Sequence, residues 1–220
     1  MTISDIFDRY VALASPRRRR QRLAHIPLED IAMVALDCET TGLDPRRDRV
    51  VSIAALPIAR GLVVAATPAL DVIVDPRIPI PQRAVSVHGI DNARVAGCPT
   101  IADVWDEVEA MLANRVVVGH HVGFDLSVLA HEARRIGRPW QEPVHLDTAA
   151  MLGGLGISAS RHDLADLLPR LGIGARGARH TALGDATMTA DLFVELAQRL
   201  RGQGRGTFGG AIAAHRAPRT

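Results

Sequence analysis

The chain has 220 residues, of which 47% are hydrophobic, a proportion that suits one well-buried α/β domain and leaves too little chain for two large ones. No apolar run comes near the roughly 18 residues of a membrane span and the N-terminus lacks a secretory pattern, so we expect a cytoplasmic protein without membrane contact. The formal net charge of +2 permits an anionic partner, and two cysteines without a CxxC pair indicate neither a disulfide framework nor a zinc site.

Residues 1–30 are predicted to form an N-terminal extension. An amphipathic pattern over residues 3–13 precedes the basic run Arg17–Arg22. Such a run is typical of a solvated helix or linker, and contact with a phosphate backbone is the alternative.

A buried strand is predicted at Ile31–Leu36, and two carboxylates follow it at Asp37 and Glu39. Successive strand side chains point to opposite faces, so the two carboxylates share one face roughly 7 Å apart while Cys38 points to the other. Like charges this close repel unless a cation lies between them, and carboxylate oxygens favour Mg²⁺ or Mn²⁺. Because such a pair also occurs in exposed turns, a metal site requires further carboxylates and a base elsewhere.

The next apolar runs extend this strand into a sheet. Arg49–Ile58 and Leu62–Val74 are predicted strands, and the short turns between them favour antiparallel pairing. Val116–Gly119 and Val144–Asp147 follow as further strands. Strands and helices alternate in this part of the chain, so Val116–Gly119 is expected to pair parallel to Ile31–Leu36. The expected fold is therefore α/β, with a central mixed five-stranded sheet flanked by helices.

Helices are predicted from apolar periodicity. The clearest begins at Thr100, where apolar residues recur on one helical face, and three prolines between residues 76 and 81 mark a loop before it. Further helices are expected at Phe124–Ile136, His162–Leu171 and Ala182–Leu200. Residues 201–220 are rich in Gly and Arg with little to bury, so a flexible basic tail is expected there.

Two more acids and a histidine are placed to join the first pair. Asp125 lies just beyond the strand Val116–Gly119, at the strand end where open α/β sheets form their sites. His180 lies in the loop before the last helix, Thr181 suits the N-cap, and Asp185 follows one turn inside. The alternatives are a helix-dipole role for Asp125, a surface charge at Asp185 and a hydrogen-bonded loop histidine at His180.

Together these residues predict a phosphodiester hydrolase. Asp37, Glu39, Asp125 and Asp185 would hold two Mg²⁺ or Mn²⁺ ions about 3.5–4 Å apart, which suits in-line attack at phosphorus. His180 would take the proton from the attacking water.

The pattern resembles the DEDDh 3′-to-5′ exonucleases of the DnaQ-like family, which have an RNase H-like fold. Its three motifs occur in order at Asp37–Asp44, Gly119–Asp125 and His180–Ala186, and Val87–Ile90 is similar to the loop of proofreading, epsilon-subunit-like members. The resemblance spans roughly residues 31–200, which we expect to be the exonuclease domain.

The resemblance implies hydrolysis of the 3′-terminal phosphodiester with release of nucleoside 5′-monophosphates. Single-stranded or frayed DNA is favoured over RNA, in proofreading or repair, with a DNA polymerase subunit as a possible partner. The residues implied at the terminal nucleotide are Thr40, Thr41, Leu43, His88, His120 and Phe124. The alternatives are an RNA-trimming relative and a non-catalytic nucleic-acid or polymerase-binding module; the retained acids argue against the second. The sequence does not indicate an oligomeric state.

The chain departs from the family at His121, where members commonly have Asn. An imidazole can still donate a hydrogen bond to a phosphate, but its charge changes with pH. His121 is therefore expected to affect substrate preference and metal optimum more than catalysis itself.

Overall fold

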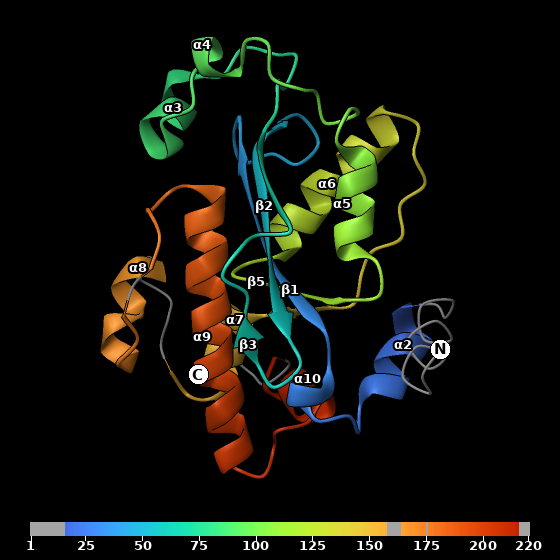
Figure 1. Cartoon of the computed structure of the whole chain (residues 1–220), viewed down its shortest axis with the longest axis vertical. Coiled ribbons are helices and arrows are strands. Elements are labelled where there is room, and N and C mark those ends of the chain that lie inside the picture. Colours follow the sequence, from blue (N-terminus) through green and yellow to red (C-terminus); the bar gives the residue numbers. More distant parts are fainter. Residues whose placement is uncertain (1–15, 158–163, 175, 216–220) are drawn as a thin grey trace.

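The computed structural model describes residues 16–157, 164–174 and 176–215. Its centre is a mixed six-stranded sheet in the order β3-β2-β1-β5-β6, with β4 also paired to β2 (Figure 1). The strands are β1 (Met33–Thr40), β2 (Val50–Ala59), β3 (Val63–Val64), β4 (Leu70–Ile73), β5 (Val116–Gly119) and β6 (His145–Asp147). The expected mixed sheet flanked by helices is confirmed, and it has one strand more than predicted because the run Leu62–Val74 is divided into β3 and β4.

Strand directions follow from the connections. β1 and β2 pair antiparallel across a short loop, from Met33 opposite Ile58 to Thr40 opposite Val50, with an irregularity between Glu39 and Thr40. β5 pairs parallel to β1, and β6 parallel to β5. The C-terminal ends of β1, β5 and β6 therefore meet at one edge of the sheet, as the sequence predicted for β1 and β5.

Helices cover both faces of the sheet (Figure 1). One face is covered by α9 (Ala182–Gly202), and the other by α5 (Trp105–Leu112) and α6 (Gly123–Arg135). The remaining helices are α2 (Pro16–Leu23), α3 (Gln82–His88), α4 (Asn92–Val95), α7 (Thr148–Gly154), α8 (Leu164–Leu167) and α10 (Phe208–His215), with short 3-10 turns at η1 (Leu28–Asp30) and η2 (Pro169–Leu171). No helix among the described residues is long and apolar enough to cross a membrane.

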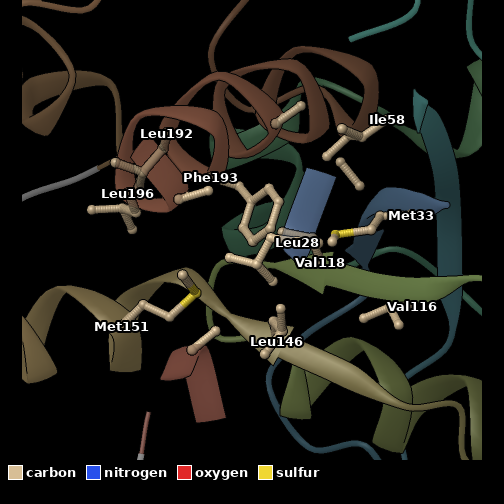
Figure 2. Packing of buried hydrophobic residues seen from close by; sticks show 14 of the residues in the cluster. Leu28, Met33, Ile58, Val116, Val118, Leu146, Met151, Leu192, Phe193 and Leu196 are labelled. Atoms are coloured by element: carbon tan, nitrogen blue, oxygen red, sulfur yellow. The ribbon is translucent and has the colours of Figure 1, made fainter. Parts of the chain in front are cut away.

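The alternation of β1 determines which of its residues face α9. Met33 and Ala35 are buried in the α9-side core, whereas Val34, Leu36 and Cys38 belong to the core on the α5 and α6 side. Figure 2 shows the α9-side core, in which Phe193 projects towards Met33 and Val118. Because side chains alternate along a strand, Asp37 and Glu39 continue the α9-facing row.

Several helix boundaries differ from the predictions. α5 begins at Trp105 rather than Thr100, because the backbone of Val104, with φ of −107° and ψ of 6°, is not helical. Before it, Asp103 Oδ2 accepts hydrogen bonds from the backbone nitrogen and hydroxyl of Thr100, at 2.7 Å each, and closes a turn. α3 and α4, which follow the proline-rich loop, were not predicted. The helix expected at His162–Leu171 is divided at Pro169 into α8 and η2, and its first two residues lie outside the described part.

The tail predicted for residues 201–220 is wrong over residues 208–215, which form α10. Phe208, Ala211 and Ala214 are buried, and the backbone of Ala214 lies so close to Gly154 of α7 that a Cβ there would be 1.9 Å from its oxygen. Small residues pack through their backbones, so the segment needed few large apolar side chains. Residues 216–220 lie outside the described part of the chain.

The N-terminal extension is only partly described, because the amphipathic pattern lies within residues 1–15, outside that part. The basic run forms α2, in which Arg17 and Arg18 are exposed. Arg19 donates from Nη2 to the carbonyl of Arg115 at 3.2 Å. The run is therefore not wholly a solvated surface.

Candidate active site

Three carboxylates meet where β1 ends beneath the start of α9. Ligand oxygens of Asp37, Glu39 and Asp185 all lie within 4.8 Å of one another. β1 supplies the first two from its α9-facing row, and Asp185 lies in the first turn of α9. This grouping is the one that the sequence predicted, and it could hold a divalent metal ion.

Small residues allow α9 to approach the sheet at this point. Ala54 of β2 lies opposite Asp37 in the strand register and forms a small buried cluster with Ala182 and Ala186. These two helical alanines lie three residues before and one residue after Asp185. Because alanines form the buried contact between helix and sheet here, with Leu183 only partly buried against them, α9 lies close enough for the Asp185 carboxylate to reach those of β1.

Asp125 is the fourth acid, in the first turn of α6 and 5% exposed. Its Oδ1 accepts a hydrogen bond from the backbone nitrogen of Cys38 at 2.9 Å. Cys38 lies between Asp37 and Glu39, so this bond fixes Asp125 beside the other acids. The prediction that β5 and α6 bring Asp125 to the end of β1 is confirmed.

Burial and mutual repulsion make these acids poor at holding negative charge. Burial, and then the charges of Asp125, Asp185 and Glu39, raise the pKa of Asp37 well above its ordinary value. Burial and the Asp185 charge raise the pKa of Glu39 to about 7, and burial raises that of Asp125 to about 7 despite the Cys38 hydrogen bond. A cation placed among the carboxylates would relieve this cost.

His180 lies in the loop before α9, half-buried, with φ of 56°. Thr181 is the N-cap, as predicted, and its hydroxyl oxygen accepts from the backbone nitrogen of Gly184 at 3.1 Å. Gly184 is required there because a Cβ would lie 1.9 Å from the carbonyl oxygen of Ala178. The loop that carries His180 is thus packed against the first turn of α9, one turn from Asp185.

His120 and His121 follow β5. His120 Nδ1 lies 2.9 Å from Thr148 Oγ1, which also donates to the carbonyl of Gly119 at 3.2 Å. His121 is exposed, has φ of 61°, and donates from its backbone nitrogen to Asp147 Oδ1 at 3.1 Å. Asn, Asp and His are the non-glycine residues most often found in this left-handed region, so His121 can replace the family's Asn without changing the backbone.

His88 ends α3 and is 9% exposed. Its Nδ1 accepts from the backbone nitrogen of Ile90 at 3.1 Å, so in the neutral ring Nε2 carries the proton and donates to the carbonyl of Thr40 at 3.2 Å. Burial lowers the pKa of His88, which favours the neutral ring. Both ring nitrogens make contacts within the protein, so His88 links α3 to the end of β1. Its role at the terminal nucleotide stays a prediction.

Of the residues at the end of β1 and just beyond it, Thr40 and Thr41 are buried and Leu43 is exposed. Thr40 donates from its hydroxyl to the carbonyl of Gly42 at 2.6 Å, and Thr41 is fully buried, with a hydroxyl that donates to Asp48 and accepts from Arg49. Leu43 is 88% exposed. Both threonine hydroxyls make hydrogen bonds within the loop. The contacts of Thr40, Thr41 and Leu43 with the terminal nucleotide stay a prediction.

Two residues of this site were not predicted. Asp147 Oδ1 caps α7 by accepting from Ala149 at 2.9 Å and also binds the backbone of His121, and Thr148 contacts His120. Both lie at the end of β6, where strand order brings them beside β5. Their position at the carboxyl end of the predicted strand Val144–Asp147 was the signal that could have identified them.

The model of the exonuclease family RNase_T matches residues 34–193. The chain belongs to this family. The match includes every carboxylate of the site and His180.

Relatives of known annotation carry related names. The chain is 40% identical over 192 residues to a DNA polymerase III subunit epsilon-like protein of Rhodobacter capsulatus, which covers 86% of the chain and 27% of that protein. It is 29% identical to DNA polymerase III subunit epsilon of Aquifex aeolicus, over 79% of the chain and 84% of that protein. The chain thus spans about a quarter of the length of the first relative.

Solved structures of exonucleases share the fold. The structure of Exonuclease X in complex with 5′ overhanging duplex DNA is similar over 83% of this chain and 99% of the Exonuclease X chain, with a TM-score of 0.63 and 22% identity. The structure of E. coli Exonuclease I in complex with a dT13 oligonucleotide is similar over 79% of this chain and 42% of the Exonuclease I chain, with a TM-score of 0.68 and 19% identity. This likeness confirms the RNase H-like fold.

Proposed function

We propose that the protein is a metal-dependent 3′-to-5′ exonuclease that hydrolyses the 3′-terminal phosphodiester of single-stranded or frayed DNA and releases nucleoside 5′-monophosphates. The observation that carries the proposal is the convergence of Asp37, Glu39 and Asp185 within 4.8 Å, in a chain of the exonuclease family. The names of the relatives favour DNA and association with a DNA polymerase. We propose a role in proofreading or repair on the basis of the resemblance of the motifs.

The four carboxylates fit Mg²⁺ or Mn²⁺, and we propose two ions. Hard oxygen ligands suit both metals, and burial together with the neighbouring acids raises the pKa of Asp37, Glu39 and Asp125, a cost that a bound cation would relieve. When bound, such ions activate water and neutralise charge that develops on the phosphate.

His180 is the proposed general base. It precedes the helix that supplies Asp185, and its loop is packed against that helix through Gly184. A general base must lie within hydrogen-bond reach of the proton it takes, and we propose that the His180 ring reaches the attacking water from this loop. In this role His180 accepts the proton of the attacking water, which then adds to phosphorus as the 3′-oxygen leaves.

The terminal nucleotide would lie against the exposed residues around the acids. Leu43 and Phe124 would offer apolar surfaces on which any base can stack, and His120 and His121, which follow β5, would lie beside the phosphate. Phe124 is half-buried against the α5 and α6 core, which restricts its ring. Thr40, Thr41 and His88 would support this surface through their contacts within the protein.

The test uses 5′-labelled single-stranded DNA and the same sequence as RNA, each with Mg²⁺, with Mn²⁺ and with chelator. The proposal expects a ladder that shortens from the 3′-end of DNA faster than RNA, requires metal, and disappears in Asp37→Asn. Glu107→Gln, which removes an exposed acid on α5, is the matched control and should retain full activity. Faster shortening of RNA would reassign the substrate, and retention of both strands in a gel shift without shortening would favour a binding module.

A further inference from the structure

The loop between β1 and β2, residues 41–49, presents Leu43 to solvent beside the acids. A single exposed leucine is ordinary on a protein surface. This one is carried by a backbone that is tied at both ends, and the tie is a side chain with no role in the site described above.

That side chain is the carboxylate of Asp48. Its Oδ1 accepts from the hydroxyl of Thr41 at 2.9 Å, and its Oδ2 accepts from the backbone nitrogen of Asp44 at 2.8 Å. The backbone nitrogen of Asp48 in turn donates to the carbonyl of Asp44 at 2.8 Å. One carboxylate therefore joins the residues on either side of Gly42 and Leu43.

Gly42 brings the loop directly onto this carboxylate. A Cβ at Gly42 would lie 2.5 Å from Asp48 Oδ2, so any side chain at this position would displace the Asp48 carboxylate. The Thr40 hydroxyl holds the carbonyl of the same glycine. The backbone from Thr40 to Asp44 is therefore fixed around Asp48.

Helix α6 holds the other end of the loop. Arg135 donates from Nη1 to the carbonyl of Asp48 at 3.1 Å and from Nη2 to that of Arg46 at 2.6 Å. Glu132, 1% exposed, accepts from Arg49 Nε at 2.8 Å and from the backbone nitrogen of Val50 at 3.2 Å. Since α6 also carries Asp125 in its first turn, one helix supports both the loop and a carboxylate of the site.

We infer that Asp48 is a positioning residue that holds Leu43 and the neighbouring backbone where the 3′-terminal nucleotide binds. The inference rests on the proposed exonuclease function. Asp48 acts through Leu43 and the loop backbone, so its loss should weaken capture of the strand end and leave the carboxylates of the site in place.

The first variant is Asp48→Asn, which keeps the shape of the side chain. Two donors, the Thr41 hydroxyl and the Asp44 nitrogen, converge on two carboxylate oxygens, and an amide can accept from only one of them. Losing a hydrogen bond to a charged acceptor shifts the loop equilibrium by about tenfold, and apparent affinity falls with the fraction of loops in the binding-competent conformation. KM for a single-stranded oligonucleotide should rise, by up to about tenfold, while kcat stays within about twofold.

A double-mutant cycle with Leu43→Ala tests whether Asp48→Asn raises KM by misplacing Leu43 or by weakening substrate binding elsewhere. If Asp48 acts through Leu43, the rise in KM caused by Asp48→Asn should shrink to about threefold or less in the Leu43→Ala background. Arg135→Gln loosens the same loop from α6 and should also raise KM with little change in kcat, which keeps the inference testable if Asp48→Asn folds poorly.

Asp103→Asn is the matched control, because Asp103 also ties a turn through a backbone nitrogen and a threonine hydroxyl, but before α5. It should leave KM and kcat unchanged, and Mn²⁺ affinity should be unchanged in Asp48→Asn. An Asp48→Asn enzyme with the KM of the parent, a loss confined to kcat, or additive effects in the cycle would overturn the inference alone. A parent protein that releases no nucleotide would remove the proposed function as well.

Discussion

Without metal, the acids of the site should make the folded protein less stable as pH rises. Glu39 and Asp125 have pKa values of about 7 in the folded protein, against 4.5 and 3.8 as ordinary values. Below about pH 4 these groups are protonated in both states and cost nothing. Between there and pH 7 the unfolded chain gives up its protons first, so the free energy of unfolding falls until the folded groups ionise.

The size of this effect follows from the shifts. A rise of about 2.5 pKa units at Glu39 corresponds to on the order of 3 kcal/mol, and the contribution of Asp125 does not simply add because the acids interact. For a chain of this size 3 kcal/mol lowers Tm by roughly 6–12 °C. Chelated protein should therefore melt about that much lower at pH 8 than at pH 5, and Mn²⁺ should restore most of the loss at pH 8.

The measurement is Tm against pH, with chelator and with Mn²⁺. Glu39→Gln should flatten the metal-free profile because the amide cannot ionise, whereas Glu107→Gln, at an exposed position on α5, should not. A metal-free profile that rises from pH 5 to pH 8, or one that Glu39→Gln leaves unchanged, would refute the argument that the carboxylates are held at raised pKa.

Three further outcomes are expected. Asp185→Asn should abolish nucleotide release yet raise metal-free Tm at pH 8, since it removes a repelling charge but no core packing; retained turnover would remove Asp185 from the site. His180→Gln should lower kcat at least about a hundredfold without changing Mn²⁺ affinity measured by calorimetry, and an unchanged kcat would reassign the base. Gly154→Ala should destabilise the fold by about 1–3 kcal/mol in urea unfolding because its methyl group would overlap the backbone of Ala214, and an unchanged midpoint would show that α10 does not dock there.

The parts of the site that lie on regular elements could be predicted from the sequence. The period of two along β1 puts Asp37 and Glu39 on one face, and the N-cap at Thr181 fixes where α9 begins and hence where Asp185 lies. These positions depend on local geometry that the sequence specifies directly.

What could not be predicted depends on contacts between distant segments. Asp48 resembles an ordinary loop acid until Thr41 and Gly42 are found against its carboxylate and Arg135 against its backbone carbonyl. α10 was missed because it packs through glycine and alanine backbones, which apolar patterning does not register, and Asp147 because its partner, His121, lies 26 positions earlier in the chain.

The central claim is that the carboxylates of β1, α6 and α9 hold the metal ions required for hydrolysis at a 3′-end. It is tested most directly by nucleotide release from the 3′-end, read as the shortening of a 5′-labelled oligonucleotide, as Mn²⁺ is titrated into chelated protein, with Mn²⁺ binding followed in parallel. The account predicts that release rises with occupancy in the parent protein, and that Asp37→Asn binds Mn²⁺ more weakly and releases nothing at any concentration. Release by the chelated parent, or by Asp37→Asn at the parent's rate, would contradict it.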